Sequence, residues 1–258
     1  MALPRAIDAP AAPAKIAISG VTKRYDAAEA RPPVLLDVDL DIAENEFVTL
    51  IGRSGCGKTT LLNIVAGLVE ATSGTVAVDG APVTGPGRGK GMVFQQHALF
   101  PWLTARRNIE FGAKSRGLDP QAAHAEADQL LSLIGLSAYG DKYPNQLSGG
   151  MQQRVAIARA LALDPHILLM DEPFGALDEI TRIEMQDELL RVWQSRRKTV
   201  VFVTHSITEA LMLSDRIIAM RANPGGIAAE YRIDLPRPRS RADVRLAALH
   251  EKLWEHLR

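Results

Sequence analysis

The sequence predicts an α/β fold with a largely parallel central sheet, an N-terminal antiparallel β subdomain and an inserted α-helical subdomain. Three observations support this prediction. Short apolar runs alternate with helical patterns along most of the 258 residues, two alternating segments precede the first buried run, and helical spacing dominates between residues 97 and 144. We place the main domain at residues 15–230, the helical subdomain at about 97–160, and a C-terminal linker with an amphipathic helix at 231–258.

Charge and cysteine content limit the functional classes. Lys plus Arg and Asp plus Glu both number 30, so no net field attracts nucleic acid, and we expect no nucleic-acid partner. The single cysteine fits a reducing compartment, and the N-terminus lacks the apolar core of a secretory signal. No apolar run approaches the roughly 18 residues that cross a bilayer. We therefore expect a cytoplasmic protein that meets a membrane only through a partner.

The first 42 residues predict a tail and two antiparallel strands. Residues 1–14 are rich in Ala and Pro without a period, which is typical of disorder. Residues 15–19 and 34–42 alternate as strands. Tyr25 lies between them, either as an ordinary half-buried tyrosine or as a stacking surface for adenine. The second of these strands carries three carboxylates on one face, which a solvated strand face explains better than a metal site does; these are Asp37, Asp39 and Asp41.

The central motif is a glycine-rich turn between a buried strand, residues 47–51, and a helix that continues from residue 60. It matches G-x-x-x-x-G-K-[ST], a phosphate-binding loop. Its glycines let backbone N–H groups converge on an anion at the positive end of a helix, while the lysine reaches the β- and γ-phosphates and the threonine hydroxyl binds Mg²⁺. The loop consists of Gly52, Arg53, Ser54, Gly55, Cys56, Gly57, Lys58, Thr59 and Thr60.

Residues 75–80 and 91–94 continue the strands, and Gln95 follows the second of them, at the sheet edge where ligands gather. A loop glutamine without a role is the alternative. Helical patterns at 105–113 and 120–134 then predict the inserted subdomain. Its entry loop, which contains Phe100 and Trp102, either anchors the subdomain or docks another protein. The second helix is expected to bury Leu130, Leu131, Leu133 and Ile134.

A second helix N-terminus that could bind an anion follows in the same subdomain. Ser148 is a good N-cap, and Gly149 and Gly150 leave the first backbone N–H groups of the helix bare. Because residues 52–59 already cradle one nucleotide, this helix end would be explained if it closed on a nucleotide held by another copy of the chain. An ordinary capped helix would have a similar sequence.

Two further strand ends carry polar side chains. Asp171 ends an apolar strand and can hold Mg²⁺ through water, and the adjacent Glu172 can orient or deprotonate an attacking water. His205 ends the strand at 199–204, where it contacts the γ-phosphate or is an ordinary satisfied edge residue. Asp178 is expected at the N-cap of the helix at 180–194. The C-terminal helix is expected to pack on the body, rather than on a membrane surface, through Leu246, Leu249, Leu253 and Leu257.

In this chain order, the motifs closely resemble those of the ATP-binding cassette (ABC) ATPases. The resemblance covers nearly all of residues 15–221. It implies a P-loop NTPase core of the RecA-like type, with ATP and Mg²⁺ as cofactors. It also implies a head-to-tail homodimer, in which each ATP is held by one phosphate loop and by Ser148, Gly149 and Gly150 of the other chain. The matching motifs are Tyr25, residues 52–59, Gln95, residues 147–152, Asp171, Glu172, Asp178 and His205.

The resemblance also implies a role for each matching residue. Tyr25 would stack on adenine, and Asp178 would couple the two sites across the dimer. Lys58 and the loop amides would bind phosphate, with Glu172 as the general base and His205 as the γ-phosphate sensor. Mg²⁺ would be bound by Thr59, Gln95 and Asp171.

Several segments resemble one branch, the importer ATPases for taurine, aliphatic sulfonates and nitrate. The branch implies a peripheral subunit on the cytoplasmic face of the inner membrane that energises uptake of a small anionic solute. Its partners would be integral membrane permease subunits and, indirectly, an extracytoplasmic solute-binding protein, with Phe100 and Trp102 in the permease-docking surface. The chain departs from the branch at Ser206, where aspartate is usual, and at Ala105, where valine is common. The similar segments are residues 85–87, 91–95, 99–104, 171–178 and 234–239.

Two alternatives belong to other functional classes. A soluble ABC-type ATPase that acts on DNA or ribosomes usually carries two cassettes or long coiled coils, whereas this chain has one cassette and no heptads. A small-molecule kinase could use the same phosphate loop, but it leaves the Leu147-Ser-Gly-Gly segment without a role.

Overall fold

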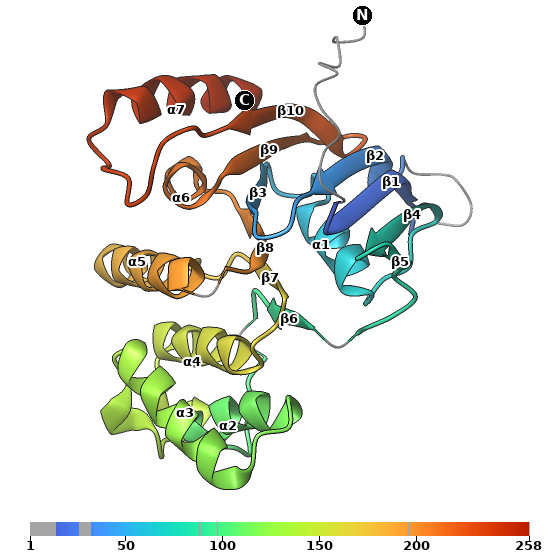
Figure 1. Cartoon of the computed structure of the whole chain (residues 1–258). Coiled ribbons are helices and arrows are strands. Elements are labelled where there is room, and N and C mark those ends of the chain that lie inside the picture. Colours follow the sequence, from blue (N-terminus) through green and yellow to red (C-terminus); the bar gives the residue numbers. More distant parts are fainter. Residues whose placement is uncertain (1–13, 26–31, 88, 97, 196, 258) are drawn as a thin grey trace, which may run out of the picture.

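The computed structural model describes residues 14–25, 32–87, 89–96, 98–195 and 197–257, so the predicted N-terminal tail lies outside the described residues except for Ala14. Within these ranges the strands form two sheets (Figure 1). One has the order β2-β1-β4-β5 and is antiparallel, and the other has the order β10-β9-β3-β8-β7-β6. The predicted α/β fold and its antiparallel β subdomain are confirmed.

The antiparallel subdomain follows the predicted alternation except at one irregularity. The register of β1 with β2 shifts on either side of Val21, and Asp37 lies opposite with a positive φ of 49°. As a result Leu35 is fully buried while Leu36 is 38% exposed. The strands are β1 (Ile16–Lys23), β2 (Leu35–Ile42), β4 (Ser73–Val78) and β5 (Ala81–Pro82).

The central sheet is parallel from β9 to β6, with β10 antiparallel at one edge. Every residue of β3, β7 and β8 is buried, as expected for strands covered on both faces. Because β3 and β7 both flank β8 in parallel, their carboxyl ends reach one edge of the sheet. The strands are β3 (Phe47–Gly52), β6 (Lys90–Val93), β7 (Ile167–Asp171), β8 (Thr199–Thr204), β9 (Arg216–Arg221) and β10 (Gly226–Arg232).

Alternate side chains of the central strands enter two hydrophobic cores. Val48 and Leu50 of β3 pack with the antiparallel sheet and α1, whereas Phe47 and Ile51 pack with the remaining helices. The period of two along each strand separates these faces. Three helices cover the second face, α5 (Glu179–Ser195), α6 (Ile207–Leu213) and α7 (Val244–Leu257), and α1 (Lys58–Ala66) lies on the first (Figure 1).

The helical subdomain, drawn in green to yellow in Figure 1, lies between β6 and β7 in the chain. The prediction for its second helix needs a correction. Leu131 and Ile134 are buried, but the buried stripe of α3 continues through Ala123 and Ala127, whereas Leu130 is only partly buried and packs at the margin of the core. Small side chains permit close approach to the neighbouring helix. The elements are α2 (Ala105–Ser115), α3 (Pro120–Leu133), η1 (Ser137–Tyr139), η2 (Pro144–Gln146) and α4 (Gly149–Ala162).

The C-terminal helix α7 packs on the body of the protein, as predicted. Leu246 and Leu253 are buried in the main core, and Leu249 and Leu257 pack against it. The last strand, β10, ends at Arg232, two residues beyond the predicted end of the main domain at 230. In the part of the chain that the structure describes, no helix is long and apolar enough to span a membrane.

Candidate active site

The phosphate loop connects the carboxyl end of β3 to α1, which begins at Lys58, two residues earlier than predicted. Gly57 is the N-cap of α1 with a φ of 96°, and a Cβ atom there would lie 2.5 Å from Cδ2 of Leu35. At Gly52, a Cβ atom would lie 2.5 Å from Sγ of Cys56. Since Gly57 provides no capping side chain, the first N–H groups of α1 point into the loop and fit an anion.

Lys58 folds back over this loop. Its side-chain Nζ donates hydrogen bonds to the carbonyl oxygens of Gly52, at 2.7 Å, and Arg53, at 3.1 Å. The residue is buried, with 6% of its surface exposed. The ammonium group therefore provides a fixed, desolvated positive charge beside the backbone N–H groups that would hold a phosphate.

Asp171 connects the phosphate loop with the end of β7. Its Oδ1 accepts a hydrogen bond of 3.0 Å from the Thr59 hydroxyl, and the carboxylate is buried. Burial raises the pKa of Asp171, an effect that the Thr59 hydrogen bond opposes. Together with Gln95, both side chains line a cleft of about 930 Å³. A hydroxyl, a carboxylate and an amide oxygen are hard ligands of the kind that Mg²⁺ prefers, so these residues fit the ion.

Glu172 and His205 also meet at this edge. The Nδ1 atom of His205 lies 3.2 Å from Oε2 of Glu172, although the two residues are 33 positions apart. Glu172 has a positive φ of 46°, a conformation that costs a non-glycine residue about 1–3 kcal/mol and that clusters at active sites. Its backbone N–H is fixed by the carbonyl oxygen of Val203, at 3.0 Å. His205 is thus hydrogen bonded to a predicted catalytic residue and largely exposed to solvent.

Asp178 occupies the predicted N-cap of α5. Its Oδ1 accepts the backbone N–H of Thr181 at 3.0 Å, and this hydrogen bond lowers the pKa of the Asp178 carboxyl group. The preceding turn lies beside the start of α4, because a Cβ atom on Gly150 would be 3.1 Å from Cδ2 of Leu177. The predicted second anion-binding helix end and the Asp178 turn are therefore neighbours within one chain.

Two predicted cofactor-binding residues, Ser148 and Tyr25, contact other parts of the described chain than the Thr59–Asp171 and Glu172–His205 pairs. Ser148 caps α4 as predicted, its Oγ accepting the N–H of Met151 at 3.3 Å, but its partners belong to the helical subdomain. Tyr25 follows β1 and is 64% exposed, so the interpretation as a half-buried tyrosine is wrong. Its ring lies 5.0 Å from the Nζ atom of Lys23. An exposed ring is available for stacking.

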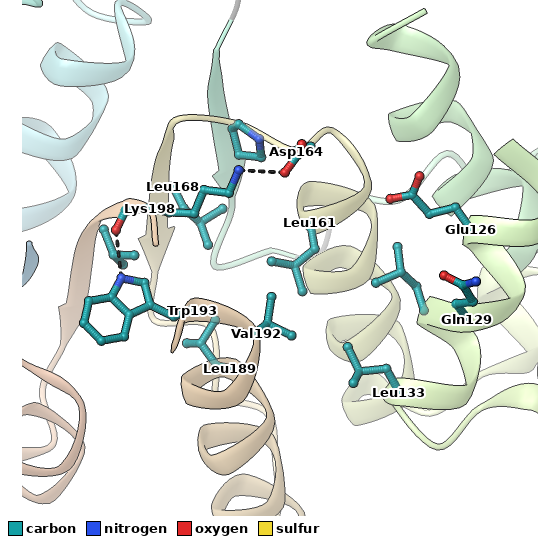
Figure 2. Close-up of a pocket in the computed structure, with 13 residues that line it drawn as sticks. Glu126, Gln129, Leu133, Leu161, Asp164, Leu168, Leu189, Val192, Trp193 and Lys198 are labelled. Atoms are coloured by element: carbon teal, nitrogen blue, oxygen red, sulfur yellow. Dashed lines mark hydrogen bonds and ion pairs between the residues drawn. The ribbon is translucent and has the colours of Figure 1, made fainter. Parts of the chain in front are cut away.

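A separate pocket of about 260 Å³ lies at the other end of the same strands (Figure 2). Leu168 and Val200, near the starts of β7 and β8, form part of its wall, and Trp193 of α5 closes one side. The Nζ atom of Lys198 pairs with Oδ1 of Asp164 at 2.6 Å along its rim. The predicted metal ligands Thr59, Gln95 and Asp171 line the cleft at the carboxyl edge and not this apolar pocket.

The loop before α2 is held by Asn108, a buried residue that belongs to none of the motifs singled out above. Its Oδ1 accepts the N–H of Phe100 at 2.9 Å, and its Nδ2 donates to the carbonyl oxygens of Phe100, Leu103 and Thr104 at 3.0–3.2 Å. The interpretation of the loop as an anchor is met by Phe100, whereas docking of another protein stays a prediction. Phe100 is half-buried and packs on Phe111, with ring centroids 4.7 Å apart, whereas Trp102 is 69% exposed.

We expect Asn108→Ala to lower the free energy of unfolding by about 1–3 kcal/mol, because it leaves buried backbone groups of this loop without partners. Denaturant titration followed by circular dichroism measures the change. The matched control is Gln121→Ala, which removes an exposed amide side chain in the same subdomain. An Asn108→Ala variant as stable as this control would contradict the role of Asn108 in holding the loop.

Comparison with known proteins shows which family the chain belongs to. A family model described as ABC transporter matches residues 35–175. The chain belongs to the ABC transporter family. As a member it is an ATPase, and its fold is that of the ABC cassettes.

Three comparisons place this cassette among its relatives. It is 48% identical over 244 residues to an uncharacterized ABC transporter ATP-binding protein of Methanocaldococcus jannaschii, covering 95% of this chain and 91% of the relative. It is 44% identical over 241 residues to the taurine import ATP-binding protein TauB of a Jannaschia species, covering 93% of this chain and 90% of the relative. A solved dimer of an ATP-binding cassette with bound ADP and Pi superposes with a TM-score of 0.79 at 36% identity, covering 86% of this chain and 100% of the other.

Proposed function

We propose that this ATPase is the nucleotide-binding subunit of an ABC importer. ATP binding closes a head-to-tail homodimer of the chain, hydrolysis reopens it, and the cycle drives a separate integral membrane permease. The observation that carries the proposal is the convergence of the Thr59–Asp171 and Glu172–His205 pairs at one sheet edge next to the phosphate loop.

In this proposal the phosphates of ATP lie on the N–H groups of the loop, with Lys58 beside the β- and γ-phosphates. Thr59, Gln95 and Asp171 hold Mg²⁺, which when bound neutralises charge on the phosphate oxygens. Glu172 orients the attacking water and accepts its proton, and His205 contacts the γ-phosphate from the position where it also bonds Glu172.

The second half of each site comes from the other copy of the chain. Ser148, Gly149 and Gly150 of that copy close on the γ-phosphate through the bare N–H groups at the start of α4. Tyr25, exposed at the end of β1, stacks on adenine. Asp178 couples the two sites, which agrees with its turn lying next to Gly150. The solved dimer of a 36% identical cassette supports this arrangement.

The proposed cargo is a small anionic solute such as taurine, another aliphatic sulfonate or nitrate. The Jannaschia relative named for taurine import supports this class. The subunit would work at the cytoplasmic face of the inner membrane, with the permease docked at the cleft beside Gln95 and on the exposed Trp102. An extracytoplasmic binding protein would deliver the solute to the permease.

Affinity purification of the tagged chain from detergent-solubilised native membranes tests this function. We expect a polytopic permease to co-purify and the ATPase rate of the complex to rise with a binding protein loaded with its solute. Recovery with ribosomes or nucleic acid alone would instead favour a soluble ABC-type ATPase, and the transport proposal would then be rejected.

A further inference from the structure

Two turns at the edge of the active site are linked within one chain by an ion pair between a buried glutamate and a half-buried arginine. One turn carries His205, between β8 and α6, and the other carries Asp178, before α5. Glu209 of α6 holds the first turn and Arg182 of α5 holds the second. Neither residue belongs to a sequence motif, and α5 and α6 come together only because both cover the same face of the sheet (Figure 1).

Glu209 fixes the backbone on both sides of His205. The Glu209 residue is 6% exposed, and its Oε2 accepts a hydrogen bond of 2.5 Å from the hydroxyl of Thr204. That hydroxyl in turn accepts the N–H of Ser206 at 3.0 Å, and the Oγ of Ser206 accepts the N–H of Glu209 at 3.3 Å. Residues 204, 206 and 209 thus form a closed set of hydrogen bonds around the His205 turn.

Arg182 holds the Asp178 turn through hydrogen bonds, as Glu209 holds the His205 turn. Its Nη2 donates to the carbonyl oxygen of Leu177 at 2.8 Å, and its Nη1 donates to Glu179 at 2.8 Å. The remaining Nε atom is buried without a hydrogen-bond partner among the described residues, and it lies 3.8 Å from Oε1 of Glu209. A buried carboxylate needs a compensating cation, and Arg182 is placed to provide it.

The carboxylate of Glu209 also acts electrostatically on the catalytic pair. Burial raises the pKa of Glu209, and the Thr204 hydrogen bond, Arg182 and His205 oppose this effect, while the Glu172 charge adds to it. The Glu209 side chain is therefore within electrostatic reach of both Glu172 and His205 as well as of Arg182. A shift of the Arg182 guanidinium would change the field and the hydrogen bonds at His205 together.

We propose that Arg182 and Glu209 are positioning residues that transmit the position of the Asp178 turn to the Glu172–His205 pair of the same chain. The inference rests on the proposed function, in which Asp178 contacts the second copy. Closure of the dimer presses on the Asp178 turn, Arg182 moves with the carbonyl of Leu177, and Glu209 follows through its charge. The position of the Glu172–His205 pair relative to the nucleotide then depends on whether the partner cassette is in place.

Steady-state ATPase kinetics of Glu209→Gln, Arg182→Met and the double variant test this link. Each single change should lower kcat roughly tenfold, with the KM for ATP within about twofold and a Hill coefficient that falls toward 1. Because both residues act through one contact, the double variant should be no slower than the slower single variant. Arg182→Lys, which keeps the charge but loses the planar donor set, should retain an intermediate kcat.

The matched control is Arg191→Met on the same helix, which removes the exposed ion-pair partner of Glu188 and should keep the parent kcat. Losses that multiply in the double variant, an unchanged Hill coefficient, or an equal loss in the control would overturn the link. Should Glu209→Gln unfold at the assay temperature in a melting experiment, the comparison of Arg182→Met with Arg182→Lys decides the same question. A parent chain that hydrolyses no ATP would overturn the proposed function itself, which separates the two failures.

Discussion

Replacement of Glu172 by glutamine is expected to lower the rate of ATP hydrolysis by about 10² to 10⁴, the usual contribution of a positioned general base. Glutamine keeps the size of the side chain but cannot accept the proton of the attacking water. The amide can still bond Nδ1 of His205, which lies 3.2 Å from the present carboxylate. ATP binding should persist, because the phosphate loop, Lys58 and Asp171 are unchanged.

The same variant should accumulate as a stable ATP-bound dimer, since closure no longer leads to hydrolysis. Phosphate release measures the rate, and size-exclusion chromatography with and without ATP measures the dimer. Glu184→Gln, which neutralises an exposed carboxylate of α5, is the control and should keep the parent rate and the parent elution volume. If Glu172→Gln hydrolysed ATP at the parent rate, Glu172 would not be the base.

The local parts of the site could be predicted because each is encoded within a few consecutive residues. The glycines of the phosphate loop connect a strand to a helix as predicted, and Lys58 and Thr59 form the first turn of that helix. Asp171 and His205 were expected at one sheet edge because each ends a strand, and the strand order β3-β8-β7 brings those ends together. Because neighbouring parallel strands end at the same edge of a sheet, residues that follow such strands in the sequence lie close together in the structure.

Other features depend on packing between distant segments, which no local pattern records. The Arg182–Glu209 pair exists only because α5 and α6 cover the same face of the sheet. In α3 the prediction selected the large apolar side chains, but the buried residues of the helix are Ala123, Ala127 and Leu131, whereas Leu130 is only partly buried. Leu36 is exposed because the shifted register at β2 breaks an alternation that otherwise holds.

Lys58→Ala is expected to abolish ATP binding at the concentrations that saturate the parent protein. Removing one partner of a buried, hydrogen-bonded charge pair costs about 2–5 kcal/mol, which corresponds to a rise in Kd of roughly 30-fold to several thousand-fold. The effect should be this large because Lys58 is buried inside the loop, where its ammonium group is hydrogen bonded and largely shielded from solvent. Isothermal titration calorimetry with ATP measures the change.

The outcome separates a role in binding from a role in folding. In the ligand-free chain the Lys58 ammonium bonds the carbonyl oxygens of Gly52 and Arg53, so its loss also removes two contacts of the loop. The midpoint temperature of thermal unfolding without ATP should therefore fall slightly in Lys58→Ala. The control Lys252→Ala, on the exposed face of α7, should change neither this temperature nor the ATP affinity. An unchanged ATP affinity in Lys58→Ala would contradict the phosphate-binding role. A large loss of stability with unchanged affinity would make Lys58 a structural residue of the loop.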